Sequence, residues 1–406
     1  MKKVLVSAAL LFGVTNTNAQ NIKWIRKSFD DTVTRATYSI SFSTDGSKVF
    51  SGSQCSPSIL RIFNTDNGDI LWNYKLNDSL MCVQGAKLSS NGQKAAAIEE
   101  LGNLLIFDYT TTPPTLQNVV HLGVKNSYAV NFSPDGSRVA IANSNKKLFI
   151  YNTDGTLMHD VDAHQNWVYC IDWSKDEKIA TGGDDALVKL WDTSGNLIRT
   201  MTGHSGGILG VKISPNGNYV VSCSKDKTVK VWDAATGTCL RTLTGHTAII
   251  KSLDISDDGN KIVSGGDDST IKVWDLNNGT LLASFGIPEA GGIYSVDFSP
   301  NGRYVLAGTG NGDVQLWDMM FRTTVKQIVA DNTEIYPNPC TNELNIKNTG
   351  VDDILSIYDV SGKTYNTVVR KVDNDVLVNT STLPPANYFL TIQNGHKTQT
   401  IHFIKK

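Results

Sequence analysis

The sequence feature that most constrains the fold is an aromatic residue followed by Asp or Asn, which recurs at intervals of 40 to 44 residues. The seven copies begin at Phe63, Phe107, Tyr151, Trp191, Trp232, Trp274 and Trp317. A period of about 40 to 45 residues is typical of proteins in which each repeat is one four-stranded blade. Seven blades can close into a ring that leaves only short, protected strand edges.

A second marker keeps the same register. Each repeat contains a five-residue segment such as Phe42–Gly46 (FSTDG) or Phe298–Gly302 (FSPNG), although the fourth copy, Trp173–Glu177, ends in Glu. Asp-Gly and Asn-Gly between apolar runs favour β-hairpins, because Gly adopts positive φ without steric cost. Each copy therefore predicts a turn between two antiparallel strands, and the chain is expected to be all-β.

Three repeats also carry a polar set at constant spacing, in which a hydroxyl residue stands ten residues before the Trp and an acid six before it. The sets are His164, Thr181, Asp185 and Trp191; His204, Ser222, Asp226 and Trp232; and His246, Ser264, Asp268 and Trp274. A catalytic triad has no reason to recur in successive repeats, whereas a buried hydrogen-bonded group does. We therefore interpret these sets as structural, with no catalytic residue among them.

Through these sets and the Gly-His pairs at 203–204 and 245–246, the sequence resembles the WD40-repeat family. The resemblance implies a seven-bladed WD40-type β-propeller over residues 20–330, in which the His, hydroxyl, acid and Trp of one blade form a hydrogen-bonded tetrad. A strand from one terminus is expected to complete the last blade. Both Ile22–Phe29 and Phe321–Val329 fit that place, and the sequence does not decide between them.

The resemblance also implies where partners bind, on the face around the central channel. Contact positions carried over from the family lie three and five residues after the His, and one before the tetrad acid, which here gives Asp184, Lys225 and Asp267. The candidate partner-binding residues are Tyr38, Tyr128, Trp167, Tyr169, Leu209, Lys251 and Tyr294. Aromatic residues are common binding anchors, but they also favour strands, so the tyrosines could simply begin β-strands.

The first 19 residues have the pattern of a signal peptide. Met1–Lys3 is basic, Val4–Val14 is apolar, and Thr17–Ala19 provides a small-residue cleavage site. The mature chain is therefore expected to begin at Gln20. No later apolar stretch approaches the roughly 20 residues that a membrane-spanning helix needs, which argues against a membrane span.

Residues 331–406 are predicted to form a second domain of short alternating strands, a small Ig-like β-sandwich. The segment Ile335–Pro339 (IYPNP), the segment Ile357–Lys363 (IYDVSGK) and the terminal Lys405-Lys406 resemble the C-terminal sorting domain of the type IX secretion system. The resemblance implies that Tyr336, Pro337, Asn338, Pro339, Lys405 and Lys406 belong to the sorting motif. It also implies passage across a bacterial outer membrane to the cell surface or beyond. Removal of the domain after export, or its retention, stays open.

Composition excludes several partner classes. Lys plus Arg number 37 against 39 Asp plus Glu, a net charge of −2, so nothing draws the chain as a whole to nucleic acid. The histidines and six cysteines show no metal-ligand spacing, and no cofactor or metal is predicted. Export permits disulfides, although Cys170 and Cys223 are expected to be small buried residues. The pairing of the others stays open.

These observations favour a non-enzymatic, exported scaffold that binds a protein or peptide on the propeller face and engages the type IX machinery through its tail. A propeller enzyme or a carbohydrate-binding protein is the alternative from another class, and it would place carboxylates inward at the channel. At the aligned mouth positions the only acids are Asp184 and Asp267, in different blades, which favours the scaffold. A component of the surface or secretion machinery cannot be separated from the scaffold by sequence.

Overall fold

The computed structural model describes residues 22–28, 36–53, 59–76 and 82–319, and in the C-terminal region 335–336, 340–346, 354–359, 364–365, 369–372, 375–394 and 397–405. The chain divides into two compact units, Gln20–Met320 and a second one that contains Phe321–Lys406. The expected signal peptide and the candidate closing segment Phe321–Val329 lie outside the described residues.

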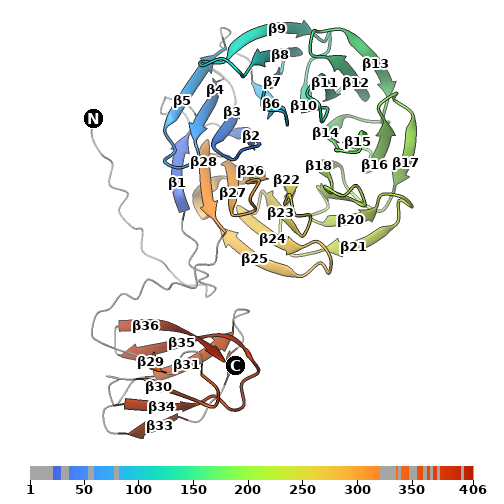
Figure 1. Cartoon of the computed structure of the whole chain (residues 1–406). Helices are drawn as coiled ribbons and strands as arrows, with labels where there is room; N and C mark the ends of the chain where they lie inside the picture. Colours follow the sequence, from blue (N-terminus) through green and yellow to red (C-terminus); the bar gives the residue numbers. More distant parts are fainter. Residues whose placement is uncertain are drawn as a thin grey trace. The chain divides into compact units, whose positions relative to one another are not determined.

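The first unit is a ring of seven four-stranded antiparallel sheets (Figure 1), as the seven repeats predict. In blades 1 to 6, four consecutive strands run from the innermost to the outermost position. Blade 1 consists of β2 (Thr37–Phe42), β3 (Lys48–Ser53), β4 (Ile59–Asn64) and β5 (Ile70–Lys75). Blade 2 consists of β6 (Val83–Leu88), β7 (Lys94–Glu99), β8 (Asn103–Asp108) and β9 (Thr115–His121). Blade 3 consists of β10 (Ser127–Phe132), β11 (Arg138–Asn143), β12 (Lys147–Asn152) and β13 (Leu157–Asp162).

The next three blades repeat this order. Blade 4 consists of β14 (Val168–Trp173), β15 (Lys178–Gly183), β16 (Val188–Asp192) and β17 (Leu197–Met201). Blade 5 consists of β18 (Ile208–Ile213), β19 (Tyr219–Ser224), β20 (Val229–Asp233) and β21 (Cys239–Leu243). Blade 6 consists of β22 (Ile250–Ile255), β23 (Lys261–Gly266), β24 (Thr270–Asp275) and β25 (Leu281–Gly286), and a 3-10 turn, η1 (Pro288–Ala290), leads out of it.

Blade 7 settles the question that the sequence left open. Its strands β26 (Ile293–Phe298), β27 (Tyr304–Thr309) and β28 (Asp313–Asp318) are completed by β1 (Ile22–Lys27), which pairs antiparallel with β28. The innermost strands β2 and β26 contact one another, so the first and last blades are neighbours. The N-terminal strand therefore closes the ring.

Side chains of β1 tie blade 7 to blade 1. The Trp24 indole nitrogen donates to the Thr65 carbonyl at 2.8 Å, and the Arg26 guanidinium donates to the carbonyls of Gly68 at 2.9 Å and Asn67 at 2.7 Å. Trp24 is buried in a cluster that contains residues of both blades, including Phe63. Closure thus combines a strand ladder, hydrogen bonds to the neighbouring turn and apolar packing.

Replacing Trp24 by Ala is expected to lower the free energy of unfolding by about 3–5 kcal/mol, because it leaves a cavity at the closure. Ile25→Ala, on the same strand but with the side chain 43% exposed, is the control and is expected to change it by less than about 0.5 kcal/mol. Chemical denaturation of both variants tests this. Equal losses would show that closure does not depend on Trp24.

The hairpin between the first two strands of each blade has one local design. A Ser hydroxyl donates to the Asp or Asn two residues later, as from Ser43 to Asp45 at 2.6 Å, and accepts a backbone N–H from the next strand. Six blades place Gly at positive φ in the turn, between 64° and 72°. In blade 4 Glu177 adopts φ 59° at this place, so the turn forms there without Gly.

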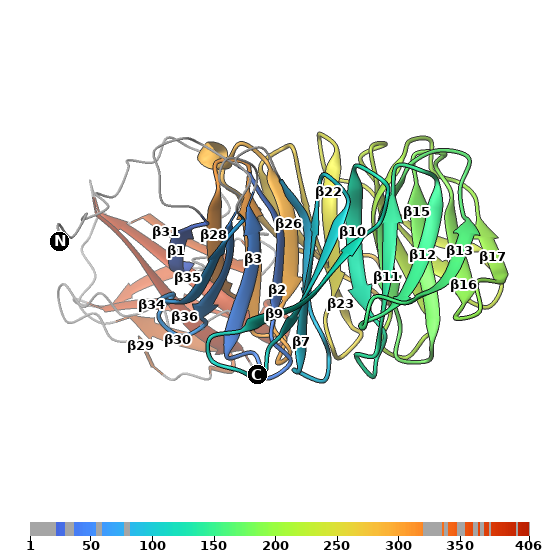
Figure 2. The same ribbon diagram turned by 90° about the horizontal axis from the view of Figure 1, so that it is seen from above.

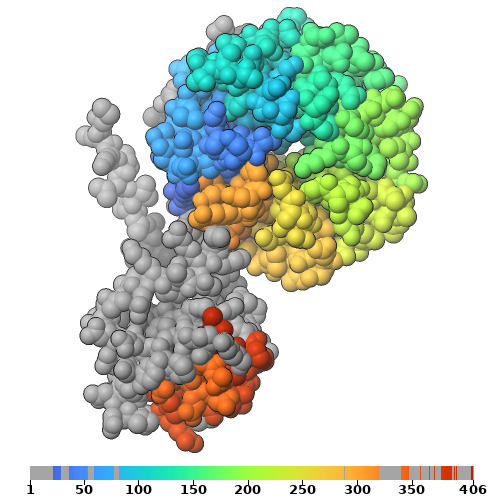
Figure 3. Space-filling model, in the orientation of Figure 1, coloured from blue at the N-terminus to red at the C-terminus, as the bar shows by residue number. Residues whose placement is uncertain are grey.

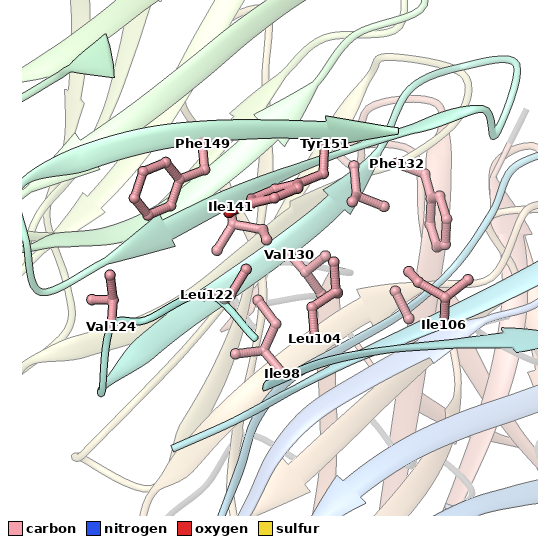
Figure 4. Packing of buried hydrophobic residues seen from close by; sticks show 12 residues of the cluster. Ile98, Leu104, Ile106, Leu122, Val124, Val130, Phe132, Ile141, Phe149 and Tyr151 are labelled. Carbon is pink, nitrogen blue, oxygen red and sulfur yellow. The ribbon is translucent and has the colours of Figure 1, made fainter. Parts of the chain in front are cut away.

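The blades are held together by apolar side chains between successive sheets. Between blades 2 and 3, Ile98, Leu104 and Ile106 pack against Val130, Phe132 and others of the next blade (Figure 4). Seen edge-on, the strands run between the two faces of the ring, so the loops gather on these faces (Figure 2). The face with the loops that enter the innermost strands is called the mouth face here.

The C-terminal unit contains two four-stranded sheets. One is formed by β29 (Ile335–Tyr336), β30 (Glu343–Ile346), β34 (Asp375–Asn379) and β33 (Val369–Val372). The other is formed by β32 (Thr364–Tyr365), β31 (Ile354–Asp359), β35 (Ala386–Asn394) and β36 (Lys397–Lys405). Buried residues of both sheets, among them Leu344, Val378, Ile357 and Leu390, form one cluster, which is the packing that a two-sheet domain requires.

Candidate binding face and channel

The three polar sets form hydrogen-bonded tetrads. In blade 5 the Trp232 indole nitrogen donates to the Ser222 hydroxyl at 2.8 Å, and that hydroxyl lies 2.9 Å from His204 Nε2. His204 Nδ1 lies 2.7 Å from a carboxylate oxygen of Asp226. A neutral imidazole with its proton on Nδ1 satisfies every member of this chain. Each tetrad thus links the loop before the innermost strand to the second and third strands.

Blades 4 and 6 repeat the geometry, and blade 7 lacks it. His164 lies 2.8 Å from Thr181 and 2.9 Å from Asp185, and Trp274 donates to Ser264 at 2.9 Å. In blade 7 Ala307 stands where the hydroxyl would be, and the indole nitrogen of Trp317 has no hydrogen-bond partner among the residues that the structure describes. The missing hydroxyl therefore leaves a buried donor unsatisfied.

Burial and charge favour a stabilising role for the tetrads. The side chains of Ser222, Ser264 and Thr181 are fully buried, so no substrate can reach a hydroxyl that already accepts the indole N–H. Burial lowers the pKa of His204, although Asp226 opposes this, so the imidazole is neutral near pH 7. Burial alone would raise the pKa of Asp226, but hydrogen bonds from Thr228, His204 and the Ser205 amide lower it.

Replacing Asp226 by Ala is expected to lower the free energy of unfolding by about 1–3 kcal/mol, because a buried His and a backbone amide lose their acceptor. Asp162→Ala, whose side chain is 91% exposed, is the control and is expected to be nearly neutral. Thermal unfolding of the two variants tests this. A fully stable Asp226→Ala protein would contradict the structural role.

A β-bulge at the start of each innermost strand shapes the mouth of the channel. In blade 1, Thr37 pairs with Ser53 and Ser39 with Gly52, so Tyr38 is the extra residue, and the same irregularity recurs in every blade. Bulges re-aim a side chain. The seven bulge residues, called the mouth ring here, are Tyr38, Gln84, Tyr128, Tyr169, Leu209, Lys251 and Tyr294. All seven are half-buried, and the space-filling view shows a hollow at the centre of the ring (Figure 3).

The aromatic members of the mouth form two groups. The rings of Tyr38 and Tyr294, from blades 1 and 7, have centroids 5.3 Å apart. The ring centroid of Tyr128 in blade 3 lies 5.1 Å from that of Tyr169 and 6.2 Å from that of Trp167, both of blade 4. Trp167 is 44% exposed. The structure therefore brings the predicted tyrosines and the Trp together, in two groups on neighbouring pairs of blades.

Two ion pairs lie beside these groups. Lys225 Nζ is 2.6 Å from Asp184 and 4.8 Å from the centroid of the Tyr169 ring. Lys251 Nζ is 3.2 Å from Asp267 and 5.4 Å from the centroid of the Tyr294 ring. The lysines thus satisfy both a carboxylate and an aromatic face.

Sequence reasoning missed one member of the mouth ring, Gln84. Tyr169 follows from its offset after His164, whereas Tyr38, Tyr128 and Tyr294 lie five residues before the Ser of their turns. The same count from Ser89 gives Gln84. It also missed a second ring deeper in the channel, which lies five residues before the last residue of each turn segment, Gly in six blades and Glu177 in blade 4. That ring, called the channel ring here, is the fifth residue of each innermost strand: Ser41, Lys87, Asn131, Asp172, Lys212, Asp254 and Asp297.

The channel ring is a paired charge network. Lys212 Nζ lies 3.0 Å from Asp254 and 3.7 Å from Asp172, and Lys87 Nζ lies 3.7 Å from Asp297. These three aspartates are only 7 to 8% exposed. From the sequence, a propeller enzyme is expected to place carboxylates inward at the channel. The channel ring has such carboxylates, below the mouth positions to which that expectation was confined.

Each of these carboxylates accepts a backbone hydrogen bond from the next blade. The backbone N–H of Ile213 donates to Asp172 at 2.9 Å, that of Phe298 to Asp254 at 2.9 Å, and that of Phe42 to Asp297 at 2.8 Å. Bonds that join consecutive blades stabilise the ring. The inward carboxylates are therefore explained by blade-to-blade contacts.

The electrostatics of Asp297 give a pH dependence. Burial and the nearby Asp254 raise the pKa of Asp297 to about 6, although Lys87 and Lys212 oppose the shift. An acid whose pKa is higher in the folded state binds its proton more tightly there. Stability contributed by the protonated form is therefore lost as pH rises from about 4 to about 6.

The variant Asp297→Asn removes this titration. The parent protein is expected to lose about 1–3 kcal/mol of unfolding free energy through this titration between pH 4.5 and pH 7. The variant is expected to avoid that loss, because its side chain at position 297 cannot ionise. Urea unfolding at the two pH values measures the change. A stability difference that is the same at both values would show that Asp297 does not titrate in this range.

The described residues also bear on metal binding, membrane insertion and disulfide formation. They contain no group of three or more His, Cys, Asp or Glu that could hold a metal ion. No helix in these residues is long and apolar enough to cross a membrane. Cys82 is disulfide-bonded, whereas Cys170, Cys223, Cys239 and Cys340 are free thiols. Cys170 and Cys223 are buried, as expected.

The structure describes part of the sorting motif. Tyr336 lies in β29, and Lys405, which is buried, ends β36. Pro337, Asn338, Pro339 and Lys406 lie outside the described residues.

Comparison with protein families assigns both units. The family "WD domain, G-beta repeat" matches residues 155–192, 195–233, 237–275 and 279–318. The matched repeats are those that end in Trp-Asp, and the unmatched ones have Phe or Tyr in place of the Trp. The ring is therefore a seven-bladed propeller of WD40 repeats. The family "Secretion system C-terminal sorting domain" matches residues 334–406, so the chain is a WD40-repeat protein with a type IX sorting domain, which implies its secretion.

Similar curated proteins share parts of the propeller. The LEC14B protein of Lithospermum erythrorhizon is 28% identical over 231 residues, which is 50% of this chain and 47% of that protein. The nuclear distribution protein nudF of Aspergillus niger is 42% identical over 64 residues, 16% of this chain and 14% of that protein. The protein HIRA of Dictyostelium discoideum is 29% identical over 144 residues, 29% of this chain and 13% of that protein. The chain spans less than half the length of each.

Proposed function

We propose that this protein is a non-enzymatic scaffold that acts at the cell surface or outside the cell and binds a protein or peptide at the aromatic mouth of its propeller. The observation that carries the proposal is the gathering of four tyrosines, on the innermost strands, and Trp167, directly before one of them, at one face. Partly exposed aromatic side chains at the centre of a surface supply large contact area at low entropic cost.

The location of action is supported by two independent features. The sorting domain at residues 334–406 directs the chain into the type IX pathway. The disulfide-bonded Cys82 fits an oxidising compartment, where disulfides persist. The partner is then a surface or extracellular protein.

A non-enzymatic role is supported by the state of the reactive groups. The tetrad hydroxyls are buried beneath Trp indoles, and the channel aspartates are paired with lysines and backbone amides. At the mouth, Asp184 and Asp267 are each paired with a Lys. None of these groups combines exposure with the unpaired state that a nucleophile or general base needs.

The proposal is tested by affinity capture from cell-surface and culture-fluid extracts, with the chain from Gln20 to Lys406 as bait. A quadruple variant, Tyr38→Ala, Tyr128→Ala, Tyr169→Ala and Tyr294→Ala, is compared with the parent protein. The expected result is one or more proteins captured by the parent and reduced at least about tenfold with the variant, because the aromatic anchors are lost.

The matched control places four Ala substitutions on outermost strands, at the exposed residues Leu71, Met158, Ile198 and Leu282. Thermal unfolding verifies that both variants are folded. Equal capture by the parent and the tyrosine variant, or loss with the control alone, would contradict the proposed site. Capture of glycans in place of proteins would favour the carbohydrate-binding alternative.

A further inference from the structure

A second set of mouth residues reveals an imbalance of charge. The residue after the second strand of a blade donates its backbone N–H to a loop carbonyl two residues before the mouth ring, at 2.8 to 3.1 Å. The described members of this set, called the hairpin ring here, are Glu100, Ser144, Asp184, Lys225, Asp267 and Gly310. The hairpin ring and the mouth ring therefore lie side by side around the channel.

Two of the three acids in the hairpin ring are paired within the mouth. Asp184 of blade 4 pairs with Lys225, the hairpin-ring residue of blade 5. Asp267 of blade 6 pairs with Lys251, the mouth-ring residue of its own blade. An acid of the hairpin ring can therefore pair with either of two neighbours. One is the hairpin-ring residue of the next blade, and the other is the mouth-ring residue of the same blade.

Glu100 has neither kind of partner. The next hairpin-ring residue is Ser144, whose hydroxyl donates to the Lys125 carbonyl at 2.8 Å, and the mouth-ring residue of blade 2 is Gln84. The Glu100 carboxylate makes no hydrogen bond or ion pair within the described parts of the chain. The described members of the two rings include three acids and two lysines, so among them Glu100 is the one charge without an opposite partner.

The position of Glu100 puts this charge between the aromatic groups. The backbone N–H of Glu100 donates to the carbonyl of Cys82, just before the innermost strand of blade 2. Its carbonyl accepts the backbone N–H of Asn126, two residues before Tyr128, at 2.7 Å. Its charge contributes, after burial and the neighbouring tyrosines, to raising the pKa of Tyr38 and of Tyr128, which reaches about 12. The charge of Glu100 in blade 2 therefore acts on tyrosines of the blades on either side, Tyr38 of blade 1 and Tyr128 of blade 3.

We propose that Glu100, with Tyr38 and Tyr128, forms the subsite for a cationic side chain, arginine or lysine, presented by a peptide partner. Aromatic faces attract cations, and a half-buried unpaired carboxylate supplies a charge-assisted hydrogen bond. Both lysines of the two rings, Lys225 and Lys251, are already paired, so neither is free to balance an anionic group placed beside Glu100. The inference rests on the proposed function and names the chemistry of its partner.

The test uses the full chain from Gln20 to Lys406 and two blocked pentapeptides, one with a central Arg between glycines and one with citrulline, its neutral isostere. Binding is followed to millimolar concentration by NMR shifts of the peptide. The Arg peptide is expected to bind about tenfold or more tightly than the citrulline peptide. Glu100→Gln is expected to abolish that preference, and Asp162→Asn, the same charge change on an outermost strand, to preserve it.

Three outcomes overturn the subsite: equal binding of the two peptides, no shift with either, or an unchanged preference in Glu100→Gln. A guanidinium chloride arm separates the sources of the cation, because competition by the free ion as strong as that of the peptide would contradict a peptide partner. Affinity capture with Glu100→Gln distinguishes the two proposals. A partner kept by Glu100→Gln but lost by the tyrosine variant would refute the subsite alone, whereas a partner kept by both would refute the mouth itself.

Discussion

The pairing of β1 with β28 is the interaction on which the rest of the structure depends. A four-stranded blade cannot bury both of its faces by itself, so each blade needs a neighbour on either side, and only closure supplies one to the first and the last. Trp24 packs between blades 7 and 1 and bonds to the turn after β4. Because seven blades meet at one axis, seven bulge residues converge on one mouth.

The geometry of closure also explains why charged residues line the channel without destabilising it. An isolated Asp at 7 to 8% exposure would shift to its neutral form. In the ring, Asp172, Asp254 and Asp297 each accept the backbone N–H of the next blade and lie within reach of Lys212 or Lys87. The network joins consecutive blades, including blades 7 and 1, whereas each tetrad stabilises a single blade. Asp297, whose pKa is raised to about 6, is the member least well compensated.

The sequence predicted the parts of the fold that depend on local spacing. The seven aromatic-acid marks predicted seven blades, and the spacing of His204, Ser222, Asp226 and Trp232 predicted a tetrad whose hydrogen bonds the structure contains. The closing strand could not be chosen, because two terminal segments have the same apolar pattern. The choice depends on contacts of Trp24 and Arg26 with a turn more than 40 residues away.

Other features escaped prediction because they arise only when blades meet. Lys87, Asp172 and Lys212 precede apolar residues in alternating strands, a pattern that indicates solvent exposure. Ring closure instead places them in the channel, where Asp172 is buried and the two lysines are half-buried. Glu100 stands one residue before a Leu where other repeats have the tetrad acid, so alignment on tetrads passed over it. The tail, in contrast, carries its own motif and needed no tertiary information.

The central claim is that the mouth face receives the partner, and hydrogen–deuterium exchange of the full chain with and without its captured partner tests it most directly. Protection is expected at the loops and strand starts that carry the bulge residues, around Tyr38, Tyr128 and Tyr169, and at the hairpin of Glu100. Protection confined to the turns of the opposite face, such as Ser43–Gly46, or to the outermost strands would contradict the account.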